Sequence, residues 1–226
     1  MQNATFIDNR IESIFFDRPR DFREIWELQK KTVSEILSGT VHEKILLLEH
    51  KPVYTIGFHG DINNLHVTEE SLKRSGIEVI RIERGGDITF HGPGQLVVYP
   101  LIDLRKRKLG VKDYVAILEE SVIRTCNHIG IRVNRIDGAT GVWCGNDMAK
   151  SKKICAIGVK ISHGVTMHGL ALNVSTDLSW FNMINPCGFS SFQVTTMEEC
   201  LNGETPHFTD IAHILNRELL NLLENK

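Results

Sequence analysis

The sequence predicts an α+β fold (α/β-type) in which a mixed β-sheet is flanked by helices. Short β-rich segments neither alternate strictly with helices nor stand alone, which is typical of a sheet with helices packed on it. The apolar fraction of 42% is large enough for a sizeable core. No internal repeat or Gly/Ser/Pro-rich linker divides the 226 residues, so we expect one domain spanning 1–226.

The first half of the chain predicts strands and capped helices in turn. The alternating run IESIFF at 11–16 predicts a strand. Asp21 can cap a helix that places six apolar residues near one face and ends at Gly39. These six residues are Phe22, Ile25, Trp26, Val33, Ile36 and Leu37. KILLLEH and VYTIG predict buried strands on either side of Pro52, a short helix follows from Thr68, and IEVIRIE predicts the next strand.

The second half begins with a strand and a helix and then becomes richer in β-structure. QLVVYPLIDL predicts a strand, and apolar residues at three- and four-residue steps predict a helix from about Lys112 to Gly130. IRVNRI, TGVWC, KICAIGVKIS and GVTMHGLALNVS then predict short strands, with GNDMAKSKK as a polar hairpin loop. A short helix near 177–182, the turn NPCGF and a closing helix complete the chain, and the closing helix contains Ile211, Ile214, Leu215, Leu219 and Leu222.

Charge and hydropathy exclude several kinds of partner. The chain carries 26 basic and 28 acidic residues, a net charge of −2, which argues against a nucleic-acid groove. No apolar run approaches the ~20 residues that a membrane-spanning helix needs. The first ten residues, MQNATFIDNR, lack the apolar core of a signal peptide. We therefore expect a cytoplasmic protein without a nucleic-acid or membrane partner.

One of the five cysteines stands out from the others by its position. Their number is odd, there is no C-x-x-C, and the spacing fits no zinc site, so we expect free thiols in a reducing compartment. The five are Cys126, Cys144, Cys155, Cys187 and Cys200. Cys126 follows Val122 in an apolar helical stripe, which predicts a core residue. Cys187 lies in a turn between Pro186 and Gly188, where an exposed and functional side chain is more common.

A glycine-rich segment, RIERGGDITFHGPGQLVVYP, raises two alternatives. Two Gly turns flank DITFH, and the simplest interpretation is a wide hairpin without function. Bare backbone can also approach a ligand closely, and Arg84 and His91 favour this second interpretation. The segment is neither a P-loop, because G-x-x-x-x-G-K-[ST] is absent, nor a dinucleotide fingerprint, because no helix begins at the glycines.

Two further segments contain candidate proton-transfer groups. In KKICAIGVKI, Lys153 stands at the entrance of an apolar strand and Lys160 lies within it. Either lysine can be a solvated edge residue, or a cation that stabilises a nearby thiolate. In TMHGLALN, His168 is a possible base or a histidine satisfied by the backbone.

Together these motifs resemble the lipoyl(octanoyl) transferases. RGGDITFHGPGQLVVYP, KICAIGVKI, GVTMHGLALNV and INPCG occur in this order, and LLEHKPVYTIG and TGVW fit the family as well. The resemblance covers nearly the whole chain, from about Lys44 to Gly188. It implies an acyltransferase of lipoate biosynthesis whose fold is shared with the biotin and lipoate protein ligases.

The resemblance also implies the site residues and the partners. Cys187 would be the nucleophile and Lys153 the lysine that activates it. The implied substrate-binding residues are Arg84, Gly85, Gly86, Asp87, Ile88, Thr89, Phe90, His91, Ala156, Ile157, Gly158, Gly169, Leu170 and Ala171. Octanoyl-acyl carrier protein would be the donor. Lipoyl domains of 2-oxoacid dehydrogenase E2 subunits and the glycine cleavage H protein would be the acceptors. Neither a metal nor another cofactor is implied, and we expect a monomer.

Two other functions remain open on the sequence alone. An ATP-dependent lipoate or biotin protein ligase of the same fold would form an acyl-adenylate and would need no nucleophilic cysteine. An inactive module that binds acyl groups or carrier proteins would keep the glycine walls and tolerate the loss of Cys187. The combination of Cys187 with Lys153 favours the transferase.

Overall fold

The computed structural model describes residues 4–8, 11–145, 150–185 and 193–224. Within these ranges twelve strands form two sheets. The strands of the larger sheet are β1 (Ala4–Asp8), β2 (Ile11–Phe15), β3 (Glu43–Leu48), β7 (Gln95–Leu101), β8 (Val133–Ile136), β9 (Ala139–Cys144), β10 (Lys152–Ser162), β11 (Val165–Asn173) and β12 (Gln193–Val194). Those of the smaller sheet are β4 (Val53–Ile56), β5 (Glu78–Arg81) and β6 (Ile88–His91).

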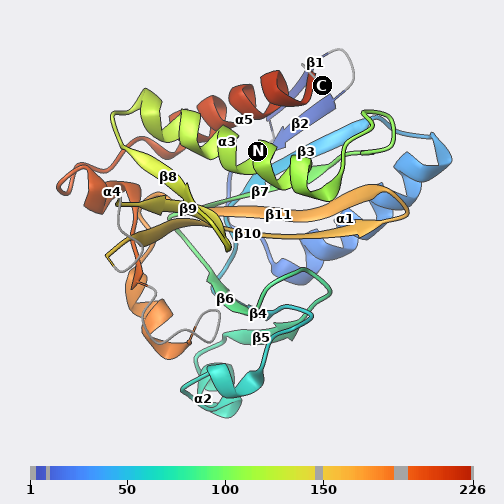
Figure 1. Cartoon of the computed structure of the whole chain (residues 1–226). Coiled ribbons are helices and arrows are strands. Elements are labelled where there is room, and N and C mark those ends of the chain that lie inside the picture. The colour runs from blue at the N-terminus through green and yellow to red at the C-terminus, as the bar shows by residue number, and fades with distance from the viewer. Residues whose placement is uncertain (1–3, 9–10, 146–149, 186–192, 225–226) are drawn as a thin grey trace.

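The larger sheet is mixed, as the sequence predicts. Its order is β1-β2-β3-β7-β11-β10-β9-β8, with β12 paired to β10. The β2–β3 and β10–β12 pairs are parallel, and the other pairs are antiparallel. The smaller sheet has the order β5-β4-β6 and lies apart from the larger one (Figure 1).

Helices cover both faces of the larger sheet. The described helices are α1 (Phe22–Ser38), α2 (Glu69–Arg74), α3 (Val111–His128), α4 (Met197–Cys200) and α5 (Phe208–Glu224), with the short 3₁₀ helices η1 (Ile62–Asn64) and η2 (Leu178–Met183). Helices α3 and α5 pack on one face and α1 on the other (Figure 1). The predicted fold class is therefore confirmed. None of the helices in the described ranges is long and apolar enough to cross a membrane.

Helix α1 begins and ends where the sequence predicts. The Asp21 carboxylate accepts hydrogen bonds from the backbone N–H groups of Arg23 and Glu24 at the N-terminus. Gly39, with φ of +74°, ends the helix. The apolar face packs on the sheet, but Leu37 differs from the prediction, because it is 38% exposed and lies off this face.

The opposite face of the larger sheet carries the largest part of the core. Leu118, Val122 and Cys126 of α3 are fully buried and belong to the same cluster as Leu215 and Leu219 of α5. The prediction that Cys126 is a core residue is confirmed. Both helices thus support β10 and β11, and these two strands carry Lys153 and the predicted binding residues at 156–158 and 169–171.

The wide hairpin that the glycine-rich segment suggested is wrong. Strand β6 pairs with β4 in the smaller sheet, whereas β7 lies between β3 and β11 in the larger one. The GPG turn is therefore the crossing between the sheets. Gly94 has φ of +79°, and a Cβ there would lie 2.6 Å from the carbonyl oxygen of Ser175. This turn consequently serves the fold.

Four other elements differ from expectation. Strands β1 and β12 and helix α4 are each five residues or shorter and were not expected from the sequence. The predicted helix near 177–182 is the 3₁₀ helix η2. The NPCGF turn falls mostly on residues 186–192 and the polar GNDMAKSKK loop partly on 146–149, and these residues lie outside the described ranges.

Candidate active site

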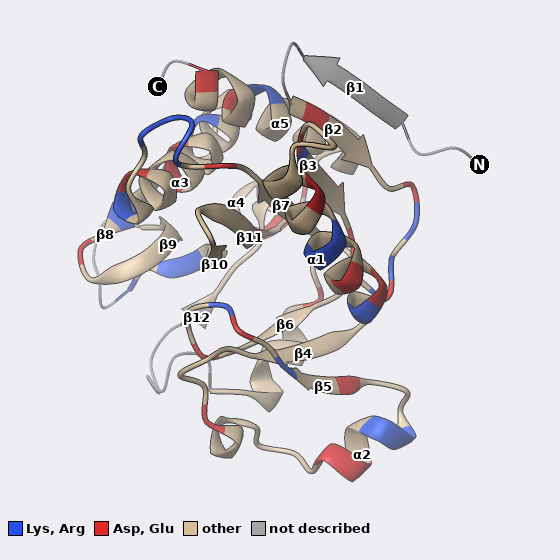
Figure 2. Ribbon diagram, turned by 90° about the vertical axis from the view of Figure 1, so that its right-hand side faces the viewer, with Lys and Arg blue, Asp and Glu red and all other residues tan. Residues whose placement is uncertain are grey.

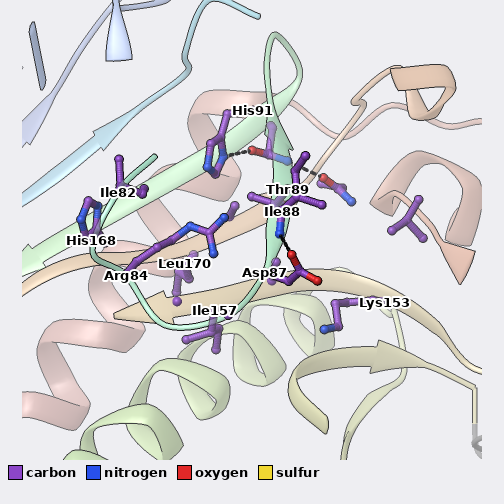
Figure 3. Close-up of a pocket in the computed structure, with 18 of the residues that line it drawn as sticks. Ile82, Arg84, Asp87, Ile88, Thr89, His91, Lys153, Ile157, His168 and Leu170 are labelled. Atoms are coloured by element: carbon purple, nitrogen blue, oxygen red, sulfur yellow. Dashed lines mark hydrogen bonds between the residues drawn. The ribbon is translucent and has the colours of Figure 1, made fainter. Parts of the chain in front are cut away.

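A narrow pocket of about 100 Å³ is lined by both sheets. Its floor is the middle of the β10–β11 pair, where Ala156 lies opposite Ala171 and Gly158 opposite Gly169. Its other walls come from the loop before β6 and from β6 itself. Figure 2 shows the smaller sheet and α2 below the larger sheet, with β12 between them. Figure 3 shows residues that line the pocket.

Most of the predicted binding residues meet in this pocket. The lining includes Arg84, Gly86, Asp87, Ile88, Thr89, His91, Ala156, Ile157, Gly158, Gly169, Leu170 and Ala171, together with Lys153. Gly85 and Phe90 are not part of the lining. Phe90 is 1% exposed and packs in the small-sheet core, with its ring stacked on Trp180. The binding role of the lining residues stays a prediction.

Close backbone contact fixes the loop before β6 against the floor. The N–H of Gly85 donates a 3.0 Å hydrogen bond to the carbonyl oxygen of Val159. A Cβ at Gly158 would lie 2.8 Å from the carbonyl oxygen of Gly85, so a larger residue would push the loop away. Gly158 therefore determines how close the two walls lie, whereas a Cβ at Gly85 would make only an ordinary 3.6 Å contact with the carbonyl oxygen of Val159.

Arg84 stabilises this loop through hydrogen bonds. Its guanidinium donates to the carbonyl oxygen of Thr55 at 2.8 Å, to the Thr55 hydroxyl at 3.0 Å and to the carbonyl oxygen of Gly85 at 2.9 Å. The side chain is buried beside the pocket. Asp87 similarly accepts from the side chain of Asn64 at 2.5 Å and from the backbone N–H of Ile88 at 2.7 Å. Both residues thus shape the pocket wall.

The two predicted histidines are buried and neutral at pH 7. His91 donates from Nδ1 to Gln95 Oε1 at 2.8 Å, and its Nε2 accepts from the Thr55 hydroxyl at 3.3 Å. Burial, followed by the nearby His50, lowers the pKa of His91 well below its usual value. Burial and then Arg84 lower the pKa of His168 to about 3. Such a weakly basic ring argues against His168 as a general base.

Lys153 occupies one end of the pocket. Its ammonium nitrogen lies 4.6 Å from the centroid of the Trp143 ring. In Figure 3 Lys153 and His168 lie at opposite ends, in agreement with the β10–β11 register, in which His168 is opposite Val159. Lys160, the alternative lysine of the same strand, is not part of the lining.

A chain of hydrogen bonds that the sequence analysis missed connects the pocket wall with Lys153. Gln95 Nε2 donates to Asn173 Oδ1 at 2.9 Å, and Asn173 Nδ2 donates to the carbonyl oxygen of Thr195 at 3.1 Å. The N–H of Thr195 then donates to the carbonyl oxygen of Lys153 at 3.0 Å. The sequence feature that could have indicated this chain is an amide side chain at one end of each of two apolar strands, Gln95 on β7 and Asn173 on β11.

The other lining residues that sequence analysis missed come mainly from distant segments. They are Phe22, Ile82, Tyr99, Phe181 and Val194, beside Gln95 and Asn173. Phe181 and Val194 stand on either side of the NPCGF segment, and their positions bring both flanks of that segment to the pocket. The apolar side chains of Phe181 and Val194 gave no indication of a binding site in the sequence.

Cys187 itself lies outside the described residues. Before it, the N–H of Asn185 donates to the carbonyl oxygen of Asn64 at 2.7 Å; after it, Val194 pairs with Lys153. Cys126 and Cys155 are fully buried, and burial raises the pKa of Cys126 to about 12 and raises that of Cys155 as well. These two thiols are thus unsuited to nucleophilic attack at neutral pH.

Comparison with known proteins identifies the family. The lipoyl protein ligase A/B catalytic domain matches residues 21–220. Octanoyltransferases of Bacteroides fragilis and Bacteroides thetaiotaomicron are 46% and 44% identical to the chain, each over 91% of its length and over 95% and 92% of their own. The chain belongs to the octanoyltransferase family. The Koribacter versatilis octanoyltransferase is 44% identical over 87% of this chain and 78% of its own. The chain is accordingly an acyltransferase.

Solved structures confirm the fold of the octanoyltransferase. Lipoate-protein ligase A bound with ATP superposes with a TM-score of 0.69 at 15% identity, over 96% of this chain and 86% of that protein. A bipartite lipoate protein ligase of Thermoplasma acidophilum also has a TM-score of 0.69 at 15% identity, over 97% and 85%. The predicted likeness to the lipoate ligase catalytic domain is therefore confirmed. In the described ranges no group of three or more His, Cys, Asp or Glu side chains is arranged to hold a metal ion.

Proposed function

We propose that this octanoyltransferase moves an octanoyl group from octanoyl-acyl carrier protein to a lysine of a lipoyl domain, through a thioester on Cys187. The observation that supports this proposal is the pocket, which combines a largely aliphatic slot with a lysine at one end. Its acceptors would be the lipoyl domains of 2-oxoacid dehydrogenase E2 subunits and the glycine cleavage H protein. The reaction would take place in the cytoplasm.

The slot suits a linear acyl chain. Ile88 supplies an aliphatic wall, and Ala156 and Ala171 keep the floor low; Ile157 and Leu170 complete the lining and pack against the core cluster of α3 and α5. Each Å² of apolar surface that leaves water contributes about 25 cal/mol, so an acyl chain is bound mainly by burial. The polar groups of Arg84 and His91 already have protein partners, which leaves the aliphatic surface as the main contact for the chain.

In the first half-reaction the Cys187 thiolate attacks the thioester carbonyl of the carrier protein. A Cys187–Lys153 ion pair would supply the thiolate. At about 4 Å and an effective dielectric of about 20, the attraction is roughly 4 kcal/mol, or about three pKa units before desolvation. The carbon–sulfur bond to the carrier breaks, the carrier thiol leaves with a proton from Lys153, and the octanoyl group remains on Cys187.

In the second half-reaction the acceptor lysine amine attacks the acyl-enzyme. Lys153, now neutral, takes a proton from the attacking amine. An amide bond forms, and the Cys187–acyl bond breaks to release the thiolate. The ion pair is then restored. Exchange between thioesters is nearly balanced in free energy and amide formation is downhill, so no nucleotide is needed.

Nucleotide dependence separates this proposal from an ATP-dependent ligase. The purified protein is mixed with an apo-lipoyl domain and either octanoyl-acyl carrier protein alone, or free octanoate with ATP and magnesium. We expect octanoylation of the domain only with the carrier-protein donor. Transfer that requires free octanoate and ATP would reject the thioester route, and no transfer from either donor would favour an inactive binding module.

A further inference from the structure

Two cysteines outside the pocket face each other. Cys144 ends β9 and Cys200 ends α4, and their sulfur atoms lie 2.8 Å apart although the residues are 56 positions apart in the chain. Both thiols are partly exposed. Formation of a bond between them would need only a small approach of the two sulfur atoms, since a disulfide joins them at about 2 Å.

The surroundings make Cys200 the more reactive of the two. The Cys144 thiol donates to the Cys200 sulfur, and the Thr195 hydroxyl lies 3.9 Å from it. The Thr195 hydroxyl donates to the Glu199 carboxylate at 2.7 Å. The hydrogen bond from Cys144 is the main cause that lowers the pKa of Cys200 to about 7, against burial and the charge of Glu199. The same hydrogen bond raises the pKa of Cys144. Cys200 is therefore the thiol of the pair that more readily loses its proton and acts as the nucleophile.

We propose that Cys144 and Cys200 form a redox-active dithiol, which closes to an intramolecular disulfide by exchange with a small-molecule disulfide such as oxidised glutathione. The Cys200 thiolate attacks one glutathione sulfur and releases the first glutathione as its thiolate. Cys144 then loses its proton and attacks the Cys200 sulfur, which releases the second glutathione. Two protein thiols are oxidised, and one glutathione disulfide is reduced to two thiols.

This cross-link would join the two segments that border Lys153. On one side Trp143, next to Cys144, contacts the Lys153 ammonium. On the other side Thr195 bonds to the Lys153 backbone and belongs to the segment that leads into α4. A disulfide between β9 and α4 would hold both segments together and raise the melting temperature, because it closes a long loop.

The test exposes the wild-type protein to oxidised glutathione, blocks the remaining thiols with N-ethylmaleimide and maps the peptides by mass spectrometry. We expect the loss of two hydrogen atoms, a Cys144–Cys200 linked peptide, and a higher melting temperature that dithiothreitol reverses. Cys126 and Cys155 should be blocked only after denaturation. The link should also form in Cys187→Ala, which removes the proposed nucleophile from competition.

Single substitutions distinguish the order of attack. Cys144→Ser keeps a hydroxyl donor to Cys200, so a stable glutathione adduct at Cys200 is expected. Cys200→Ser should leave Cys144 at least about tenfold slower to react at neutral pH. A wild-type protein that retains glutathione on Cys200, links Cys200 to Cys187, or keeps both thiols reduced would overturn the proposal.

Discussion

The N–H of Thr195 donates a 3.0 Å hydrogen bond to the carbonyl oxygen of Lys153. Strand β12, which ends at Val194, lies parallel beside the start of β10, so the chain that follows Cys187 returns to the pocket next to Lys153. The same lysine lines the pocket and lies over Trp143. These contacts fix the position of Lys153 at the pocket, and its role in proton transfer is part of the proposed mechanism.

Replacing Lys153 should change the titration of the Cys187 thiol. Lys153→Met keeps the approximate length but removes the charge, so the thiolate should form only near or above the usual thiol pKa of about 8.5. Lys153→Arg keeps a charge but cannot release a proton at neutral pH, so it should restore thiolate formation without restoring full transfer. The measurement is the pH dependence of iodoacetamide alkylation at Cys187, read by peptide mass spectrometry.

Lys160→Met is the matched control for these variants, because Lys160 lies on the same strand outside the pocket lining. It should leave the alkylation profile and the transfer rate unchanged. An unaltered profile in Lys153→Met would remove Lys153 from the mechanism, and a shifted profile in Lys160→Met would assign the role to that lysine instead.

Filling the slot should discriminate between acyl chains of different length. Ala156 lines the floor and is only partly buried, so Ala156→Leu would extend its side chain into the slot. The rate of acylation by an octanoyl donor should fall at least about tenfold, while a butyryl donor should lose much less. Both rates and the melting temperature are measured on the same preparation. An equal loss with both donors at an unchanged melting temperature would contradict an acyl slot at this position.

The buried histidines should make the fold sensitive to mild acid. Burial lowers the pKa of His50 from 6.5 to about 4. Between these values the unfolded chain binds more protons than the folded chain, so stability is full above about pH 6.5 and falls as the pH decreases. At pH 5 His50 should contribute a loss of roughly 2 kcal/mol, and His168 a similar loss. Urea unfolding at pH 7 and pH 5 measures this difference.

Two histidine variants test the origin of that loss. His50→Gln removes one titrating ring and should reduce the difference between pH 7 and pH 5. His163 is exposed in the turn between β10 and β11, so His163→Asn should leave the difference unchanged. If His50→Gln has the same acid sensitivity as the wild type, the loss comes from other groups.

The hydrogen bonds of Asn173 should matter for both stability and transfer. Asn173→Leu would leave Gln95 Nε2 and the carbonyl oxygen of Thr195 without this buried partner, which costs about 1–3 kcal/mol for each group. Because Thr195 bonds to the Lys153 backbone, transfer should fall as well. Urea unfolding and the transfer rate of the folded fraction check both effects, and Asn173→Asp, which keeps the Oδ1 acceptor, should retain part of each. Unchanged stability in Asn173→Leu would show that these hydrogen bonds do not contribute to the stability of the fold.

Local signals in the sequence were sufficient for helices α1 and α3, and the resemblance to the transferase family supplied most of the predicted pocket residues. Asp21 and Gly39 act directly on the ends of α1, and Gly158 is small where its backbone approaches that of Gly85. Helix ends depend on neighbouring residues, and a close backbone approach requires a small residue. Both can therefore be predicted from the sequence.

Features that depend on long-range register were not predictable. The Gln95–Asn173 bond joins residues 78 positions apart, and only the pairing of β7 with β11 brings them together. Likewise, the chain crosses between the two sheets at Gly94 because β6 pairs with β4. Local patterns do not determine these pairings, because hydrophobic strands of similar length can pair in many ways.

Intact-mass spectrometry after incubation with octanoyl-acyl carrier protein tests the covalent mechanism most directly. The wild-type protein should gain one octanoyl group that hydroxylamine removes, and peptide mapping should assign it to Cys187. Cys126→Ala and Cys200→Ser should still be acylated, whereas Cys187→Ala should not. An octanoyl group that persists in Cys187→Ala, or a wild-type protein that transfers octanoyl without ever gaining mass, would contradict the thioester intermediate.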